Sequence, residues 1–253
     1  MKPAPIPALE NTRLAFGLVL LAAIMFGTVP FFALSLTQSG MAPPAVAFYR
    51  YLVAALVFLP ALWFARRAWP VLLWGIGTGV VMSLGWVGYV AALSVVPVST
   101  AGVIYMSYPI FTLLIGWLIW QDRPTLRAGI AALIVLAAAA IATGVTPIDQ
   151  GQWLWVFAAF AAPLGFGFGI TVLVHKLTAI PAMARISAIS IGSVLGLLPL
   201  VLRLEPSQVW PETAEGWGLV AGIALVTATV PQLIYTYFAP VIGAARTATA
   251  GSI

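Results

Sequence analysis

The chain has 253 residues, of which 62% are hydrophobic and only 7% are charged, and its formal net charge is +5. This composition excludes an ordinary soluble domain and is typical of a membrane protein with several spans. The basic residues form no clustered stripe, which excludes nucleic acid as a partner, and the absence of cysteine excludes disulfides, thiol catalysis and cysteine-based metal sites.

Eight apolar runs are each long enough to cross a bilayer core of about 30 Å. The first run follows Lys2 and Arg13, as in a signal peptide, but it is too long for one and no small-residue cleavage site closes it. We therefore interpret it as a retained span. Residues 240–253 begin a ninth helix that is too short to span. The predicted spans are 14–36, 45–64, 71–95, 98–120, 126–145, 153–176, 182–202 and 217–238.

The spans divide into two halves. A tail, 1–13, precedes a first repeat, 14–146, with five transmembrane helices, and a second repeat, 151–253, contains three helices and the start of a fourth. Because the first half has an odd number of spans, the second half starts on the opposite side of the membrane, which predicts inverted repeats. Four weak matches occur in the same order in both halves: Trp74–Gly79 with Trp217–Gly222, Phe26-Gly27 with Phe166-Gly167, Arg50 with Arg185, and Thr100-Ala101 with Thr247-Ala248.

The distribution of Lys and Arg predicts the orientation. With the N-terminus in the cytoplasm, the outer side receives only Arg203 and, nearer the membrane, Arg50. The sequence therefore predicts a multi-pass protein of the cell (inner) membrane. The inner side receives Lys2, Arg13, Arg66, Arg67, Arg123, Arg127, Lys176 and Arg185, with Arg246 near it.

Several motifs resemble those of a permease of the drug/metabolite transporter superfamily, EamA type. They are the run Phe48-Tyr49-Arg50-Tyr51-Leu52, the turn from Pro97 to Ala101, Tyr108-Pro109, and the break Trp120-Gln121-Asp122-Arg123-Pro124-Thr125, where the family often has Gly-Glu-Arg. The resemblance implies ten helices in a five-plus-five inverted repeat. The last residues of this chain align with about Met106 of the first half, so we expect a C-terminally truncated version of a longer product.

Prolines and glycines inside the spans have structural interpretations. Pairs such as Gly75/Gly79 and Gly192/Gly196 allow close helix packing. Pro231 cannot donate to the residue four back and so frees the carbonyl of Thr227, and the same holds for three other prolines. A packed kink and a hinge beside a cavity are equally good interpretations of each. The other prolines are Pro30, Pro109 and Pro163.

Polar and aromatic residues at helical spacing form the candidate substrate site. One such stripe is more often packing between helices, and Ser and Thr hydroxyls often bond their own backbone, so the hypothesis depends on five stripes surrounding one central cavity. Gln232 is the strongest single candidate, because an amide in hydrocarbon needs a partner. The candidates are Thr28, Trp86, Tyr89, Tyr105, Tyr108, Thr112, Thr171, Gln232 and Tyr235.

Two ionisable residues have alternative interpretations. Arg50 lies about two turns into its helix, where it could meet an anionic group, although snorkelling towards the outer surface is the favoured interpretation. His175 is a candidate for proton coupling, yet beside Lys176 at the inner end of its helix an interfacial histidine is favoured.

The acidic residues narrow the function, because all six lie in the tail or in loops and none lies in mid-membrane to bind a cation. The sequence therefore predicts an all-α integral membrane protein that transports or exports small neutral or zwitterionic, amino-acid-like metabolites by alternating access, in an inverted-repeat helical bundle. The alternatives are a non-transporting scaffold or subunit that needs a partner, and an exporter of cationic drugs. An enzyme is disfavoured by a single histidine and the lack of intramembrane acids, and no cofactor or metal is expected. The expected partners are a small-molecule substrate and the lipid bilayer, and a homodimer is left open.

Overall fold

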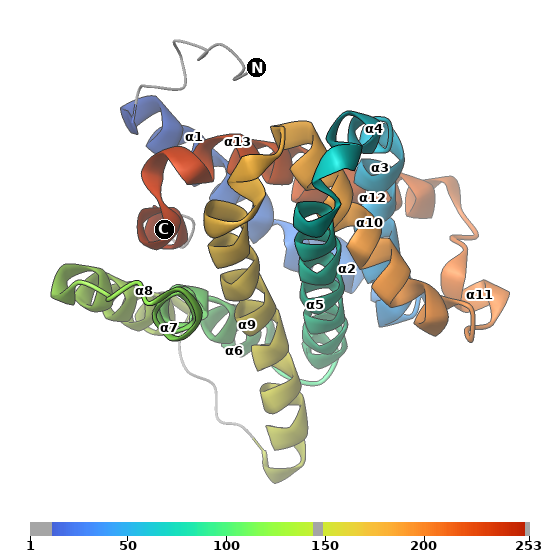
Figure 1. Ribbon diagram of the computed structural model, residues 1–253. Coiled ribbons are helices and arrows are strands. Elements are labelled where there is room, and N and C mark those ends of the chain that lie inside the picture. Colours follow the sequence, from blue (N-terminus) through green and yellow to red (C-terminus); the bar gives the residue numbers. More distant parts are fainter. Residues whose placement is uncertain (1–11, 144–148, 251–253) are drawn as a thin grey trace.

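The computed structural model describes residues 12–143 and 149–250, and this part of the chain is a bundle of helices without strands (Figure 1). The predicted all-α integral membrane fold is confirmed, since several helical segments are long and apolar enough to cross a membrane. Six such segments lie in the described ranges: Thr12–Gln38, Ala61–Leu93, Val98–Trp120, Gln150–His175, Ala182–Val201 and Ala214–Ile242. The second and fifth predicted spans correspond to shorter apolar helices, α3 and α8.

Four of the predicted spans are interrupted close to a proline. A proline has no N–H to donate, so the helical ladder weakens where it enters. This shortens α3, which ends just before Pro60, and it divides the first, fourth and eighth predicted spans. The interrupted spans are α1 (Thr12–Gly27) with α2 (Val29–Gln38), α3 (Pro43–Phe58) with α4 (Ala61–Ala65), α6 (Val98–Tyr105) with α7 (Tyr108–Trp120), and α12 (Ala214–Ala224) with a π-helix (Leu225–Thr229) and α13 (Val230–Ile242).

The centre of the bundle is formed by α5 (Trp69–Leu93), α9 (Trp153–His175) and α10 (Ala182–Val201), and Figure 1 shows α5 and α9 side by side. Glycines bring α5 and α10 together: a Cβ at Gly192 would collide with the carbonyl oxygen of Ile76, and one at Gly79 with that of Ile189. The Oγ of Ser193 donates a hydrogen bond to the carbonyl of Gly79 over 3.0 Å. These contacts confirm the packing role of the glycine pairs on these two helices.

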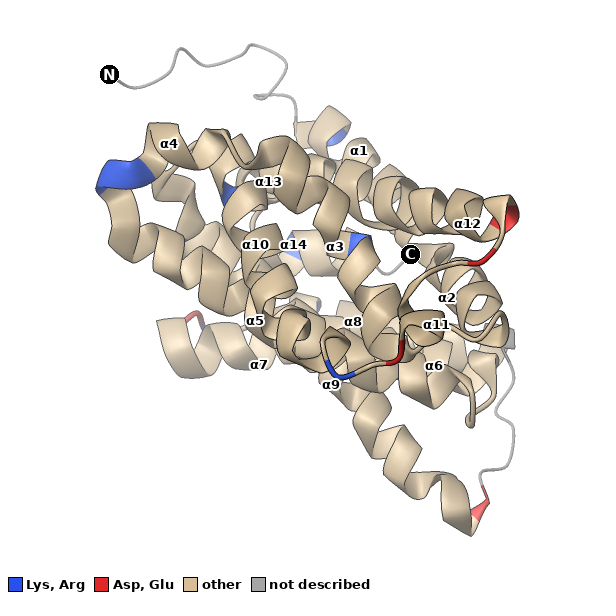
Figure 2. Cartoon of the chain, turned by 90° about the vertical axis from the view of Figure 1, so that its right-hand side faces the viewer, with Lys and Arg blue, Asp and Glu red and all other residues tan. Residues whose placement is uncertain are grey.

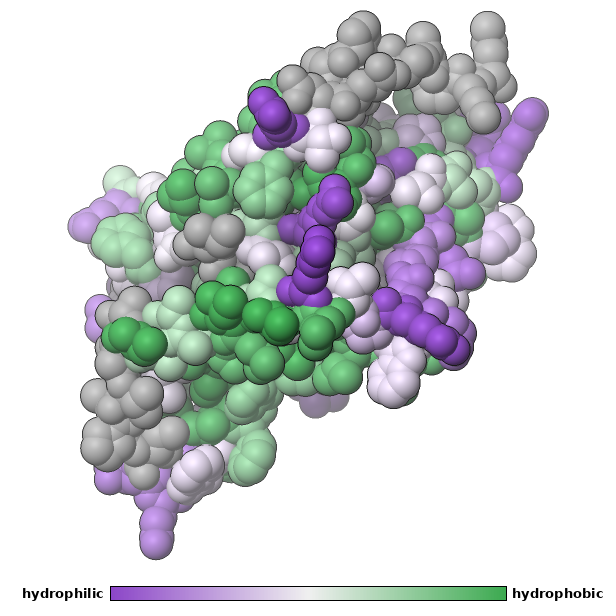
Figure 3. Space-filling model, turned by 90° about the vertical axis from the view of Figure 1, so that its left-hand side faces the viewer, coloured by the Kyte–Doolittle hydropathy of each residue, from purple (hydrophilic) through white to green (hydrophobic). Residues whose placement is uncertain are grey.

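Other helices lie at the edges of the bundle. Helix α8 (Leu126–Thr143) lies at the left edge of the molecule in Figure 1, next to α7, and its side chains Leu126, Leu133 and Ile134 are exposed. Seen from this side, the surface has hydrophobic patches between hydrophilic side chains (Figure 3), and such patches are expected where helices meet lipid. The short helices are the 3₁₀ turns Arg66–Ala68, Gln150–Gln152 and Leu177–Ala179, together with α11 (Pro206–Val209) and α14 (Ala244–Ala250).

The start of the predicted ninth helix is wrong by a few residues. Pro240 lies inside α13, and the chain breaks at Gly243, whose φ of 82° favours glycine. The last described helix, α14, follows this break. Most of the predicted tail 1–13, the end of the first repeat at residue 146 and the chain end at Ile253 lie outside the described residues.

Candidate functional site

A narrow cavity lies inside the bundle where helices from both predicted halves meet. Its walls come from α1, α3 and α5 of the first half and from α9, α10, the π-helix and α13 of the second half. The volume in which the centre of a water molecule fits is about 40 Å³, enough for a few waters but not for a metabolite. In this conformation the cavity is therefore too narrow to hold a solute.

Aromatic rings cover much of the cavity wall and continue behind it. Trp86, Phe166 and Tyr235 line the cavity. Tyr89, Tyr105 and Tyr108 stack behind them, so that all five predicted aromatic residues belong to one cluster, which Phe26 and Phe166 complete. Its ring-centroid separations are 5.2 Å for Trp86–Tyr89, 5.4 Å for Trp86–Tyr105, 5.5 Å for Tyr105–Tyr108, 5.0 Å for Tyr108–Phe166, 5.9 Å for Phe166–Tyr235 and 5.4 Å for Phe26–Tyr235.

Arg50 lines the same cavity and is only 4% exposed. Its Cζ lies 3.8 Å from the centroid of the Trp86 ring, so the guanidinium stacks on the indole. Its Nη2 donates a hydrogen bond to the carbonyl oxygen of Thr227 over 3.0 Å, whereas Nε and Nη1 have no partner. The cavity wall thus contains a buried cation with unused donors.

The buried position of Arg50 differs from the favoured interpretation of its sequence, which was snorkelling. Figure 2 shows most charged segments at helix ends and connections, whereas Arg50 lies in the middle of α3 and is buried. The reason is visible on the facing helix. Pro231 cannot donate to the carbonyl of Thr227, and Arg50 supplies the donor instead.

Gln232 adds a second unsatisfied polar group to the cavity wall. Neither its amide nitrogen nor its amide oxygen has a hydrogen-bond partner. The hydroxyls of Tyr51, on the wall, and Tyr105, behind it, are also buried without one. Buried polar groups normally find partners, so this concentration of unpaired groups makes the cavity the candidate binding site.

The three threonines predicted for the site lie away from the cavity wall. The Oγ1 of Thr28 donates to the carbonyl of Met25 over 2.7 Å. Thr112 donates to Tyr108 over 2.9 Å and Thr171 to Phe168 over 2.8 Å. Each hydroxyl therefore has a backbone acceptor within its own helix, which leaves less of its hydrogen-bonding capacity for a ligand.

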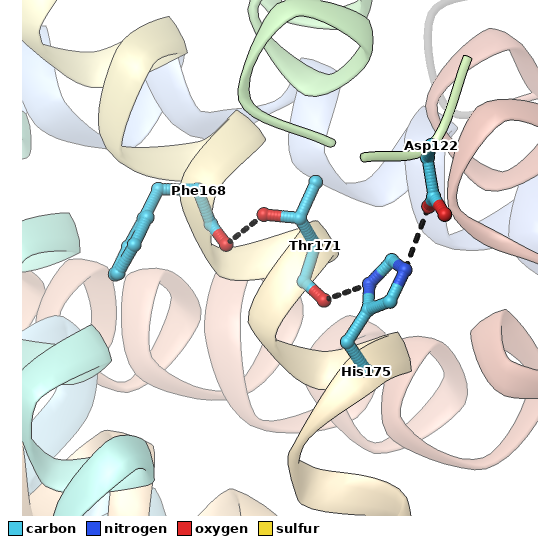
Figure 4. A network of polar contacts seen from close by, with 4 residues as sticks. All are labelled: Asp122, Phe168, Thr171 and His175. Atoms are coloured by element: carbon cyan, nitrogen blue, oxygen red, sulfur yellow. Dashed lines mark hydrogen bonds and ion pairs between the residues drawn. The ribbon is translucent and has the colours of Figure 1, made fainter. Parts of the chain in front are cut away.

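His175 also lies away from the central cavity, at the end of α9 (Figure 4). Its Nε2 lies 2.6 Å from Oδ2 of Asp122, and its Nδ1 lies 2.8 Å from the carbonyl oxygen of Thr171. Both ring nitrogens therefore lie within hydrogen-bonding distance of an oxygen atom. The ring stacks on Trp120 with centroids 4.9 Å apart, so His175 ties the end of α9 to the end of α7.

Sequence reasoning missed several residues of the cavity wall. Phe26 and Phe166 occur in the two Phe-Gly matches of the internal repeat, and Tyr51 belongs to the run 48–52 that contains Arg50. These signals were interpreted as repeat and family motifs. Two repeats that surround a cavity place equivalent residues on both walls of the cavity. The Phe-Gly match could therefore have predicted that Phe26 and Phe166 lie on its walls.

Comparison with known proteins identifies a matching family and a solved structure with a similar fold. Residues 13–144, just over half of the chain, match the model of the EamA-like transporter family. A search of curated proteins found no match. One solved structure, titled only "Crystal structure of protein", is 18% identical with a TM-score of 0.68, covering 94% of this chain and 84% of that chain. At this identity the likeness shows a shared fold.

Proposed function

The chain belongs to the EamA-like transporter family, and on that premise we propose that it moves small neutral or zwitterionic solutes, such as amino acids, across the cell's inner membrane by alternating access. The family establishes a multi-pass membrane transporter of small molecules. The solute class, the membrane, a cytoplasmic N-terminus and the mechanism are parts of the proposal.

The central cavity is the observation that carries this proposal. It is aromatic, it contains an unpartnered amide, and no carboxylate from the described part of the chain lines it. A site for lipophilic cations usually needs a buried acid, whereas rings and amides suit solutes whose charges balance. The cavity therefore favours zwitterions over the cationic drugs of the alternative hypothesis.

The packing of the helices supports the inverted repeat. In the proposed repeat α1 corresponds to α9, α3 to α10, and α5 to the helix that includes α12 and α13. The contact of α1 with α13 is then the counterpart of the contact of α9 with α5. Since α3 corresponds to α10, the contact between these two helices maps onto itself when the two repeats are interchanged. Such matching of helix contacts is expected when two inverted halves surround one site.

The cavity must open before a metabolite can enter, since it now holds only a few waters. The π-helix Leu225–Thr229 and the following Pro231 interrupt the ladder on one wall of the cavity. Such interruptions let one half of a helix move relative to the other. We place the moving wall there.

Flux into vesicles tests the proposal. The purified chain is reconstituted in phosphatidylethanolamine/phosphatidylglycerol vesicles, and uptake of radiolabelled amino acids is measured against concentration. A transporter gives uptake that saturates, and a scaffold moves nothing above protein-free vesicles. Absence of saturable uptake across the panel contradicts the proposal.

A variant that fills the cavity gives a sharper test. Ala228 lines the cavity and is 2% exposed, whereas Val226, in the same π-helix, is 37% exposed. We expect Ala228→Leu to abolish flux by occupying the cavity and Val226→Leu to leave it near the wild-type rate. Equal flux in the two variants would place the path elsewhere.

The orientation has its own measurement. Accessible-cysteine labelling should place a cysteine introduced at Asp149 on the side opposite one introduced in the first residues of the chain. Labelling of both positions from the same side would contradict the inverted halves.

A further inference from the structure

We infer that Arg50 binds a carboxylate of the solute, so that the cavity recognises amino acids and other small carboxylates and rejects the amides and amines of the same shape. This inference rests on the proposed function, since it assigns the solute that the central cavity holds. It goes beyond that function by naming the group that the site selects and the residue that selects it.

The charge of Arg50 requires a counter-charge that the described protein does not supply. A guanidinium stays protonated in proteins, so burial cannot neutralise it. Of the acidic residues in the described part of the chain, Asp122 pairs with His175 and none lines the cavity. A buried cation without an anion is unfavourable, because it has lost its hydration without gaining a charge partner.

The protein compensates only in part for the unfavourable burial of this charge. The Trp86 ring lies under the guanidinium, and the rings of Tyr51 and Phe26 lie 5.5 and 5.9 Å from its Cζ. Ring faces stabilise a cation by their quadrupole, but they accept no hydrogen bond from the in-plane N–H groups. Nε and both hydrogens of Nη1, three of the five N–H donors, have no acceptor.

The geometry suits a planar anion. Stacking on Trp86 covers one face of the guanidinium, and the N–H groups of Nε and Nη1 have no partner. Carboxylates engage this edge of a guanidinium with two parallel hydrogen bonds. The bond from Nη2 to the carbonyl of Thr227 holds the group in place. A carboxylate in the cavity would therefore meet a donor that is already oriented.

The remainder of the wall can hold the other parts of an amino acid. Gln232 offers an unpartnered amide oxygen to an ammonium group, and aromatic faces attract the same charge. The apolar part of the wall, including Ile170, Leu173 and Ile189, suits a side chain. Phosphate also binds arginine, so it has to be distinguished from a carboxylate by experiment.

Binding to a series of compounds that share one side chain tests the inference. The full chain in detergent is titrated with leucine, leucinamide, 4-methylpentanoate and isopentylamine, with inorganic phosphate as a separate probe. The readout is the shift of the thermal-unfolding midpoint with ligand concentration. We expect leucine and 4-methylpentanoate to bind, and leucinamide and isopentylamine to bind at least about 30-fold more weakly, because they lack the anion that pairs with the buried charge.

Three variants separate binding from folding. Arg50→Gln should remove the preference for carboxylates, and Arg50→Lys should give intermediate affinity because it keeps the charge and loses the planar fork. Arg66→Gln is the matched control, since Arg66 also stacks on a tryptophan, with its Cζ 4.2 Å from the Trp63 ring centroid, but is exposed and outside the cavity. It should keep wild-type binding.

The outcomes distinguish this inference from the proposed function. Equal binding of leucinamide and leucine, no binding of any carboxylate, tighter binding of phosphate, or an unchanged carboxylate preference in Arg50→Gln overturns the inference. Saturable leucine flux that persists in Arg50→Gln does the same and leaves the proposed function standing. Carboxylate binding that depends on Arg50, in a chain that shows no saturable flux, keeps the inference and removes the proposed function.

Discussion

Two arginines, one in each half of the chain, donate hydrogen bonds to the same kind of backbone carbonyl but differ in the partners of their other nitrogens. Arg50 donates to the carbonyl of Thr227, four residues before Pro231. Arg185 donates from Nη1 to the carbonyl of Thr236 over 3.0 Å, four residues before Pro240. Each guanidinium thus serves a carbonyl that a proline on the last long span cannot engage.

The remaining donors of the two arginines differ. Arg185 also donates from Nε to the carbonyl of Ile180 over 2.8 Å and from Nη2 to that of Thr178 over 3.2 Å. All three of its nitrogens are therefore bound to the backbone. In Arg50 only Nη2 has a partner, and Nε and Nη1 are buried without one.

Depth along the helix explains the contrast. Arg185 lies three residues after Ala182, the first residue of α10, and can reach the free carbonyls of the turn before it. Arg50 lies seven residues after Pro43, the first residue of α3, or about 6 Å farther into its helix at 1.5 Å per residue. The difference of about one turn makes one arginine structural and leaves the other available to a ligand.

The largest expected difference in stability follows directly. Arg185→Gln removes donors from three backbone carbonyls, and we expect it to lower the free energy of unfolding by about 2 kcal/mol, because unsatisfied acceptors away from water are costly. Arg50→Gln removes one such bond and also a buried unpaired charge, so its net cost should be below about 1 kcal/mol. Thermal unfolding in detergent micelles measures both, and equal losses would contradict the comparison.

A double-mutant cycle tests the role of the prolines. Pro240→Ala restores an N–H that can donate to the carbonyl of Thr236, so Arg185→Gln should cost about 1 kcal/mol less in that background than in the wild type. The control is Pro199→Ala, which changes a proline inside α10 that lies away from this carbonyl. Additive effects of Pro240→Ala and Arg185→Gln would show that the arginine does not replace the missing donor.

The sequence predicted the bundle and the aromatic part of the site because long apolar runs and rings at helical spacing have few alternative uses in lipid. It also predicted that prolines free carbonyls in the spans, including that of Thr227. It could not predict which side chain would take that carbonyl, because the partner is 177 residues away. For the same reason a snorkelling Arg50 was favoured over a buried one.

The threonine hydroxyls were the weakest candidates for the solute site, because each has a hydrogen-bond acceptor in its own helix. A threonine in a helix has an acceptor in its own preceding turn, and Thr28, Thr112 and Thr171 all use it. An arginine or a glutamine has more donors and acceptors than the preceding turn of its own helix can satisfy. Long polar side chains in apolar spans are therefore better guides to a cavity than short ones.

Trp86→Phe tests how far the ring beneath Arg50 prepares it for a carboxylate. Phenylalanine has a weaker ring quadrupole than tryptophan, so we expect the affinity for leucine to fall by about two- to fivefold, with little change in the abundance of the protein. Trp63→Phe, beneath the exposed Arg66, is the matched control and should leave affinity unchanged. An unchanged affinity in Trp86→Phe would show that the Thr227 carbonyl alone positions Arg50.

The smallest expected effect comes from the charge pair at the surface. The side chain of Asp122 is 56% exposed where it meets His175, so Asp122→Ala should cost less than about 1 kcal/mol. His175 keeps its bond to the carbonyl of Thr171 and its stack on Trp120 in this variant.

Salt should separate this pair from the two arginines. Screening in 1 M NaCl acts over a few ångströms of water and should remove most of the cost of Asp122→Ala. The cost of Arg185→Gln should persist, because its hydrogen bonds run to neutral carbonyls and not to a charged partner. The carboxylate preference conferred by Arg50 should persist as well, since its side chain is only 4% exposed. A preference that disappeared with salt would mean that Arg50 attracts anions through water, and the buried site would have to be replaced by an exposed one.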